Sequence, residues 1–439
     1  MALRDLLVLG ILFAGIAVAL FRPWIGVLTW NWISFMNPHR LTWYFRDFPV
    51  AQGVAVTTLL GLLFTKERRP PPFRAETVLL CLLFLYFVMT TAAAWDVARS
   101  VVQLEKVFKI YLFVLVTMML IYGYQKIRLL MLVTIASLGF FGFKGGLFAV
   151  LTGGNYRIWG PPGSFIADNT SLGLALCMLL PMALFAARAE PSRWVRSALL
   201  AVFWLSILAI LFTYSRGALL GLIAALVALG WRYKAYGIVL AVVAGIVFVM
   251  MPDLLPEQWV ARQETTLDYR EDQSAMQRIQ AWGVAVNVAL ERPFSGAGFA
   301  INYASPERWL AYANFLGDWE NRPRVAHSIY FQILGQHGFV ALGLFLGLIA
   351  VAFFRLGRLA KRCSGEATRW IGLYARGMQL SLIPYCVAGA FLDLAYFDLF
   401  YTVVLFSVVL EREYQDMRAR DIADVTVEAS APPHQEQPS

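Results

Sequence analysis

The chain has 439 residues, of which 59% are hydrophobic and 15% are charged, and its mean hydropathy is +0.62. This much apolar surface over such a length excludes a soluble enzyme and is typical of a multi-pass membrane protein. The formal net charge of +9 does not indicate nucleic-acid binding, because Lys and Arg gather in short connections between apolar runs.

The apolar runs predict an all-α integral membrane protein of about twelve membrane-spanning helices with one large periplasmic loop that itself contains helices. A further run, 24–35, follows Arg22 and Pro23 and is too short to cross alone, so we interpret it as re-entrant or interfacial. The predicted spans are 6–20, 50–64, 77–94, 107–122, 129–151, 171–187, 198–212, 218–231, 237–251, 329–354, 371–391 and 399–410.

The orientation follows from the basic connections. Because successive spans cross the membrane in opposite directions, these connections all fall on one side, which the positive charge predicts to be the cytoplasm. The long loop and the connections 95–105, 151–170 and 213–217 then face the periplasm. The basic side chains concerned are Lys66, Arg68, Arg69, Arg74, Lys126, Arg128, Arg188, Arg193, Arg196, Arg232, Lys234, Arg355, Arg358, Lys361, Arg362 and Arg369.

Four regions result from this division. Residues 1–251 form an N-terminal membrane bundle, 252–327 the large periplasmic loop, 328–411 the C-terminal spans and 412–439 a disordered cytoplasmic tail poor in apolar residues. Cys81, Cys177 and Cys386 fall inside apolar runs and Cys363 in a basic connection, so no disulfide or metal site is predicted. We expect no cofactor.

The long loop is the candidate functional region, because connections of this length are usually functional. It carries seven Arg and no Lys, although the periplasmic side disfavours cations. Planar guanidinium groups bind phosphate through two parallel hydrogen bonds, which indicates a phosphorylated lipid headgroup as ligand. Surface ion pairs account for about half of these side chains. The seven are Arg262, Arg270, Arg278, Arg292, Arg308, Arg322 and Arg324.

Within this loop, Ser274 to Gln277 fits a capping box, and 275–290 has apolar residues at helical spacing. Arg278 is therefore expected in the first turn of a helix, where exposed N–H groups and the helix dipole favour an anion. Downstream, Arg292-Pro-Phe-Ser-Gly-Ala-Gly298 predicts a turn.

A polar turn, Thr213-Tyr-Ser-Arg-Gly217, interrupts two apolar runs and places Tyr214 and Arg216 near the periplasmic edge of the bilayer. An ionisable group at this depth indicates function, although a long Arg side chain can also snorkel to the interface. Arg157 lies in a connection on the same face. Asp393 and Asp398, near the last periplasmic turn, are weaker candidates because pairing within the bundle explains them equally well.

Histidine is scarce, and His327 stands where the long loop re-enters the membrane. Water and lipid headgroups are both within reach there, and its pKa suits proton transfer. His337 follows ten residues later, about 15 Å along the same helix, and is expected to be structural.

These residues resemble a known family. The segment His327-Ser-Ile-Tyr-Phe-Gln-Ile-Leu-Gly-Gln-His-Gly338 is similar to the signature of bacterial O-antigen ligases and O-antigen polymerases, with Ala341 at the last position in place of Gly, Thr or Tyr. The 213–217 turn, Arg278-x-x-x-Trp282 and Pro293-x-x-Gly-x-Gly298 also resemble family motifs. Asn37-Pro-His-Arg-Leu-Thr-Trp43 is similar to the subgroup of O-glycosylation ligases associated with exosortases.

The resemblance implies a metal-independent, inverting glycosyltransferase of the bacterial inner membrane that moves a glycan from undecaprenyl diphosphate to lipid A core, among membrane lipids. His327, Arg278 and Arg216 would be catalytic. His327 would deprotonate the acceptor hydroxyl, and the two arginines would stabilise the leaving diphosphate. Arg157, Arg270, Arg292 and Tyr214 are the further candidates for donor binding.

Three alternatives remain open. The same donor chemistry would serve chain polymerisation or O-glycosylation of a protein, and a transporter of lipid-linked glycans would use the arginines only to escort a headgroup. A transporter needs polar residues along the whole bundle, whereas the strongest candidates here are expected on one face.

Overall fold

The computed structural model describes all residues except 1–2, 44–47, 233–272 and 431–439. The described residues are helical, with no strand among them. The long elements are α1 (Leu3–Phe21), α2 (Pro23–Met36), α3 (Val50–Phe64), α4 (Ala75–Ala92), α5 (Val97–Leu120), α6 (Tyr124–Leu151), α7 (Asn169–Ala189), α8 (Arg193–Leu211), α9 (Arg216–Arg232), α12 (Gln273–Glu291), α14 (Ile329–Arg362), α15 (Arg369–Gly389) and α16 (Asp398–Ser430). Short helices are η1 (Pro38–Leu41), η2 (Ile301–Tyr303) and α13 (Pro306–Leu310).

The predicted spans coincide with these helices, except for 237–251, which lies outside the described residues. Within the described part of the chain, six helices are long and apolar enough to cross a membrane: α1, α4, α6, α7, α8 and α14. Helices α3 and α9 are apolar but shorter. The protein is therefore an all-α, multi-pass membrane protein, and the count of twelve spans remains a prediction.

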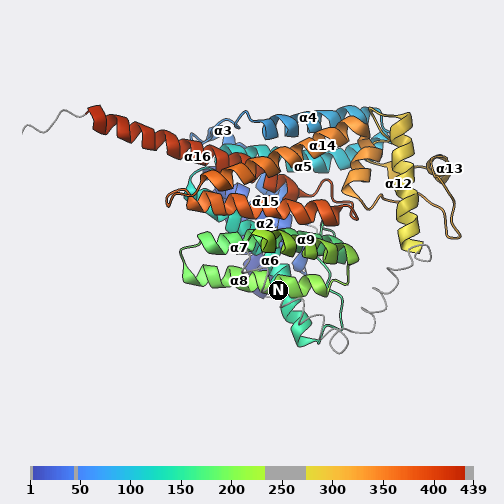
Figure 1. Ribbon diagram of the computed structural model, residues 1–439, viewed down its shortest axis with the longest axis horizontal. Helices are drawn as coiled ribbons and strands as arrows, with labels where there is room; N and C mark the ends of the chain where they lie inside the picture. Colours follow the sequence, from blue (N-terminus) through green and yellow to red (C-terminus); the bar gives the residue numbers. More distant parts are fainter. Residues whose placement is uncertain (1–2, 44–47, 233–272, 431–439) are drawn as a thin grey trace, which may run out of the picture.

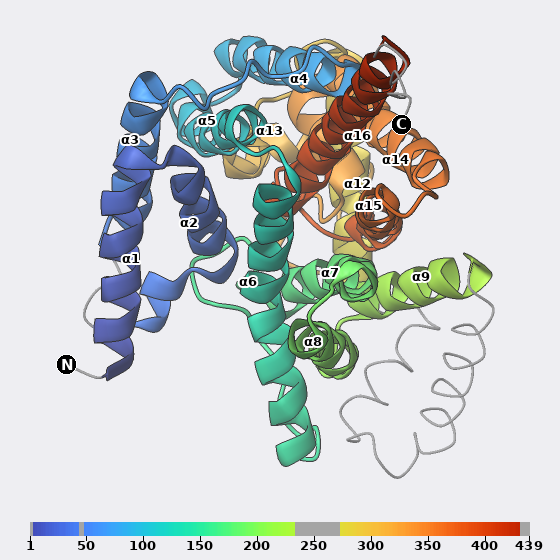
Figure 2. The same cartoon turned by 90° about the vertical axis from the view of Figure 1, so that its left-hand side faces the viewer.

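The helices run nearly side by side in one bundle, and α12 stands across one end of it (Figure 1). Seen along the bundle, α1, α2 and α3 form a group on one side, and α6 separates them from α7 and α8 (Figure 2). Helix α7 is the central element, because 94% of its apolar window is buried inside the protein.

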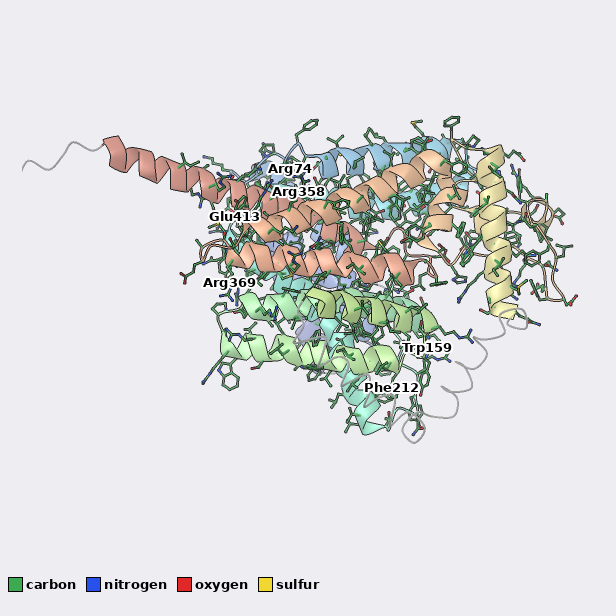
Figure 3. The ribbon with its side chains drawn as sticks, in the orientation of Figure 1. Arg74, Trp159, Phe212, Arg358, Arg369 and Glu413 are labelled. Carbon is green, nitrogen blue, oxygen red and sulfur yellow. The ribbon has the colours of Figure 1, made fainter. Side chains whose placement is uncertain are left out.

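The basic connections gather at the end opposite α12, as predicted. Figure 3 shows Arg74, Arg358 and Arg369 there, and Trp159 and Phe212 near the other end. Many of these charges are paired: Arg128 donates to both carboxylate oxygens of Glu190 at 2.9 and 2.7 Å. We call this end the basic end, and the end that carries α12 the α12 end.

Helix α2 corrects the interpretation of 24–35 as re-entrant or interfacial. None of its residues is exposed, and it packs against α1, α3 and α6. At its start Arg22 forms an ion pair of 3.3 Å with Glu67 at the basic end, and beyond its other end Arg40 contacts the loop at Pro162. The 14 residues span only about 21 Å, yet they connect the two ends of the bundle.

The C-terminal segment also differs from the prediction. A disordered tail was predicted from residue 412 onwards, whereas α16 continues as a helix to Ser430. Polar contacts explain the first part of this extension. Arg412 donates to the carbonyl of Ile121 at 2.8 Å, Glu413 accepts from the N–H of Gly123 at 2.7 Å, and Asp416 pairs with Arg69 at 2.7 Å.

Candidate active site

His327 lies immediately before α14, at the α12 end of the bundle. Its φ of 47° is in the left-handed region, which a residue with a Cβ adopts only when its surroundings enforce it. Its Nδ1 atom is 3.6 Å from Oδ2 of Asp393, in the turn between α15 and α16, and its side chain is 45% exposed. The ring therefore turns one nitrogen towards Asp393 and leaves Nε2 for another partner.

Burial and nearby charges shift both members of this pair. Partial burial of the ring, together with the positive charges of Arg278 and Arg324, lowers the pKa of His327 to about 4, and Asp168 acts in the opposite direction. Burial raises the pKa of Asp393 to about 7, although the backbone N–H groups of His327 and Ser328 and the charge of Arg278 oppose this. His327 is thus neutral at pH 7, and Asp393 titrates there.

Helix α12 holds the segment before His327 in place. Trp282 Nε1 donates to the carbonyl of Ala326 at 2.7 Å, and the Trp282 ring stacks on Phe331 with 5.0 Å between centroids. Arg278 precedes Trp282 by four residues, so the two share one face of the helix. The Arg278-x-x-x-Trp282 spacing thereby anchors the His327 segment and directs a guanidinium group to the same place.

The helix around Arg278 was predicted correctly, but its start was not. Helix α12 is described from Gln273 to Glu291, so Ser274 lies inside it and Arg278 lies beyond the first turn. The positive end of the helix dipole acts mainly on the first turn. The influence of Arg278 on His327 and Asp393 is consequently that of its own charge.

Arg216 begins α9 and follows the polar turn at Thr213. The next residue, Gly217, lies against Phe391 and Thr170, each within 4 Å of the position that a Cβ would take. These two neighbours are two residues from Asp393 and from Asp168. The structure thus brings Arg216 to the same end and the same cluster of turns as His327.

The remaining predicted donor-binding residues occupy other positions. Arg292 donates to the carbonyl of Ala93 at 2.5 Å, which ties the turn after α12 to the end of α4. The hydroxyl of Tyr214 donates to the carbonyl of Gly154, so this side chain closes the polar turn onto the 152–168 loop. Arg157 lies over the ring of Trp159, and Arg270 falls outside the described residues.

The turn Pro293–Gly298 docks onto a break in α14. Gly338 interrupts that helix with a φ of 78°, and a Cβ there would stand 2.2 Å from the carbonyl oxygen of Pro293. The N–H groups of Ala297 and Gly298 donate to the carbonyls of Gly335 and Gln336 at 2.9 and 2.8 Å. Glycine at 338 is therefore required both for the break and for the close approach.

A cavity of about 420 Å³ lies beside the His327 and Asp393 pair. Arg324 and Ala326 line it from the segment before His327, Asp393 from the last turn, and Arg99 and Lys106 from α5. We call it the Asp393 cavity. Its size suits a ligand headgroup, and polar groups from distant parts of the chain converge on it.

His337 is fully buried below this cavity, where it was expected to be structural. Its Nδ1 is 2.6 Å from Oγ1 of Thr90, and its Nε2 is 2.8 Å from the hydroxyl of Tyr396. Tyr396 lines the Asp393 cavity and donates to Oε1 of Gln336 at 2.6 Å. His337 therefore supports the turn that carries Asp393, without lining the cavity.

Comparison with known proteins bears on these motifs. Residues 201–346 match the family model described as O-antigen ligase, and residues 3–191 match a model described as a family of unknown function. No curated protein matches. A chain from the solved structure titled "Structural coordination of polymerization and crosslinking by a peptidoglycan synthase complex" has 18% identity and a TM-score of 0.38, over 76% of this chain and 95% of that chain.

Proposed function

We propose that this chain, a member of the O-antigen ligase and O-antigen polymerase superfamily, is an inverting, metal-independent glycosyltransferase that ligates a lipid-linked glycan to lipid A core. The donor is a glycan on undecaprenyl diphosphate, and the reaction takes place at the periplasmic face of the bacterial inner membrane. The observation that carries the proposal is the arrangement of His327, with Nδ1 3.6 Å from Asp393 and Arg278 and Arg324 close enough to shift its pKa.

The proposed step is a single displacement at the anomeric carbon of the donor. The acceptor hydroxyl gives its proton to Nε2 of His327, and its oxygen forms the new bond to that carbon. The bond from the carbon to the diphosphate oxygen breaks, and the diphosphate leaves with the electron pair. His327 can accept this proton because it is neutral at pH 7.

Arg278 and Arg216 are assigned to the leaving group. Charge develops on the diphosphate as the glycosidic bond breaks, and fixed guanidinium groups stabilise that charge more than they stabilise the ground state. Each guanidinium group can also donate two parallel N–H hydrogen bonds, which orient the diphosphate in line with the attacking oxygen. The gathering of these groups at one end of the bundle supports a transferase over a transporter, for which polar groups are needed along the whole path.

The principal test is replacement of His327 in the purified full-length protein. His327→Ala should lower the transfer rate by about a hundred- to ten-thousandfold while leaving folding and donor binding largely intact. His337→Ala is the matched control, since it removes a buried hydrogen-bonded ring and should cost about 1–3 kcal/mol of stability. If His327→Ala instead weakens donor binding with unchanged turnover at saturation, His327 belongs to the diphosphate site.

The acceptor is tested in the same preparation. We expect lipid A core to gain the mass of the glycan when it is incubated with protein and lipid-linked donor. A gain in mass on a second lipid-linked glycan would identify a polymerase, and a gain on a peptide would identify protein O-glycosylation. Movement of the donor between leaflets without any product would identify a transporter.

A further inference from the structure

A second cavity, of about 470 Å³, adjoins the Asp393 cavity on the side of α2 and α5. Its lining includes the cationic side chains of Arg40, Lys106 and Lys109, together with Gln103 and Ser164. We call it the Arg40 cavity. All of its lining residues lie within 3–191, the part of the chain that matches a family of unknown function.

Positive charge is in excess around this cavity. Lys109 pairs with Glu105 at 2.6 Å, whereas Lys106 has no carboxylate within 4 Å among the residues that the structure describes. Arg40 lies against the loop from α6 to α7, with Nη1 3.5 Å from the carbonyl of Pro162. The loop admits it because residue 163 is glycine: a Cβ there would stand 2.1 Å from that nitrogen.

Helix α5 connects the two cavities, since Gln103 and Lys106 line both of them. Lys106 lies nine residues after the start of α5, about 13 Å along the helix from the α12 end. Val102, one turn before Lys106 on the same face of α5, is 57% exposed. An anionic headgroup at Lys106 would therefore have an exposed apolar side chain beside it for an acyl chain, and an ionisable group in such a place indicates function.

We infer that the Arg40 cavity binds a phosphate group of the acceptor lipid, an inference that rests on the proposed transfer reaction. A transferase that joins two lipid-linked substrates needs two headgroup sites with the reacting atoms between them. The charge of Arg278 acts on His327 from α12, and Arg216 begins α9 at the same end of the bundle, whereas Arg40 and Lys106 come from the first part of the chain. Lys106 lines both cavities and Asp393 lines the Asp393 cavity, which would therefore receive the acceptor hydroxyl.

The test compares wild-type protein with the double variant Arg40→Gln, Lys106→Gln in phosphatidylcholine nanodiscs. The control, Lys66→Gln, Arg68→Gln, removes the same charge from exposed positions at the basic end. Native mass spectrometry measures binding of a diphosphorylated diglucosamine lipid and of the same lipid after phosphatase treatment. We expect wild type and control to prefer the phosphorylated lipid by about tenfold or more, and the double variant to lose this preference.

Kinetic measurements assign the site to one substrate. The double variant should raise the KM for the phosphorylated acceptor by about tenfold and leave the KM for the donor unchanged, because it removes contacts that the protein makes to the acceptor alone. A raised KM for the donor would assign the cavity to the donor diphosphate and overturn the inference. Three other results would also overturn it. Wild type could bind phosphatidylglycerol as well as the diphosphorylated lipid, inorganic phosphate alone could displace that lipid, or the double variant could bind it as wild type does.

The binding arm separates this inference from the proposed function. If no acceptor gains mass in the transfer assay but the phosphate preference disappears in the double variant alone, the proposed function fails and the phosphate site stands. If transfer to lipid A core proceeds and the double variant behaves as wild type in both assays, the phosphate site fails and the proposed function stands.

Discussion

The ionisation of Asp393, more than that of His327, is expected to set the pH dependence of transfer. The pKa of His327 is about 4, so its ring is neutral throughout the neutral range. The pKa of Asp393 is about 7, so this carboxyl loses its proton between pH 6 and 8. Once ionised, it can accept a hydrogen bond from the Nδ1–H group of His327, which fixes the tautomer and makes Nε2 the stronger base.

We therefore predict that kcat falls by about tenfold per pH unit below pH 7 and reaches a plateau above it, because only the ionised carboxylate supports the base. Asp393→Asn should lower the plateau and remove this inflection, since an amide has no proton to lose in this range. The measurement is kcat against pH for both proteins at saturating substrates. A rate that rises as pH falls would mean that the pair acts as an acid.

Substitutions of Arg278 and Arg216 test whether the diphosphate site needs planar guanidinium groups or only positive charge. Arg278→Lys and Arg216→Lys keep the charge but replace a planar pair of donors by a single ammonium group. Each variant should lose nearly as much activity as the corresponding Ala variant. The loss should be about a hundredfold or more, because the guanidinium hydrogen bonds stabilise the charge that develops in the transition state. Activity close to wild type in both Lys variants would reduce the two residues to simple charges.

Backbone strain marks the same motifs as the side-chain chemistry. Among the described residues, only Asn37, Tyr214 and His327 combine a side chain with a φ in the left-handed region, at 49°, 54° and 47°. For Tyr214 and His327 such a conformation costs about 1–3 kcal/mol, whereas Asn adopts it readily and Asn37 is the C-cap of α2. Asn37 lines the Arg40 cavity, and Tyr214 and His327 lie in the two motifs around the candidate active site.

At the scale of the element, the break in α14 determines whether the Pro293–Gly298 turn can dock. Gly338→Ala would require a φ of 78° from alanine and would place a methyl group 2.2 Å from the carbonyl of Pro293. We expect a loss of more than about 1–3 kcal/mol of stability and a reduced transfer rate. Gly343→Ala in the same helix is the control, because no atom lies within 4 Å of its Cβ position.

Thermal unfolding in detergent and the transfer rate of the folded fraction should be measured for both variants. Gly343→Ala should be as stable as wild type or slightly more stable, since alanine favours a helix over glycine. Equal stability of Gly338→Ala and wild type would show that the turn does not depend on the break.

Local sequence patterns predicted α12, but they did not predict that Asp393 is the partner of His327. Apolar residues at helical spacing over 275–290 sufficed for α12, because a helix buries residues that are near each other in sequence. Asp393 lies 66 residues after His327, in a short turn where one carboxylate has many possible partners. Only the packing of α14 against α15 and α16 brings the two together.

For the whole molecule, the apolar runs predicted the helices and the basic connections predicted their arrangement between two ends. The errors lie where tertiary contacts compensate for an unfavourable sequence. Helix α2 is short for a membrane span but is enclosed by α1, α3 and α6. The first turns beyond 411 are polar, yet Arg412 and Glu413 find partners around Ile121 and Gly123, which lets α16 continue.

The orientation of the bundle is the last prediction. The basic end should face the cytoplasm, because membrane insertion retains Lys and Arg on that side. The α12 end then faces the periplasm. Exposed positions are available at both ends: Ser305 before α13, and Glu366 between α14 and α15. Cysteines introduced there can be distinguished from the native ones once Cys81, the only exposed cysteine among the described residues, is changed to serine.

We expect a membrane-impermeant maleimide to label Ser305→Cys in intact spheroplasts and to label Glu366→Cys only after permeabilisation. Ser305 caps α13 through the N–H of Arg308, so its replacement is expected to cost about 0.5–2 kcal/mol, confined to a helix of five residues. The reverse labelling pattern would place His327 and the arginines in the cytoplasm. A periplasmic transfer reaction would then be impossible at this site, because the proposed base and the diphosphate ligands would face the wrong compartment.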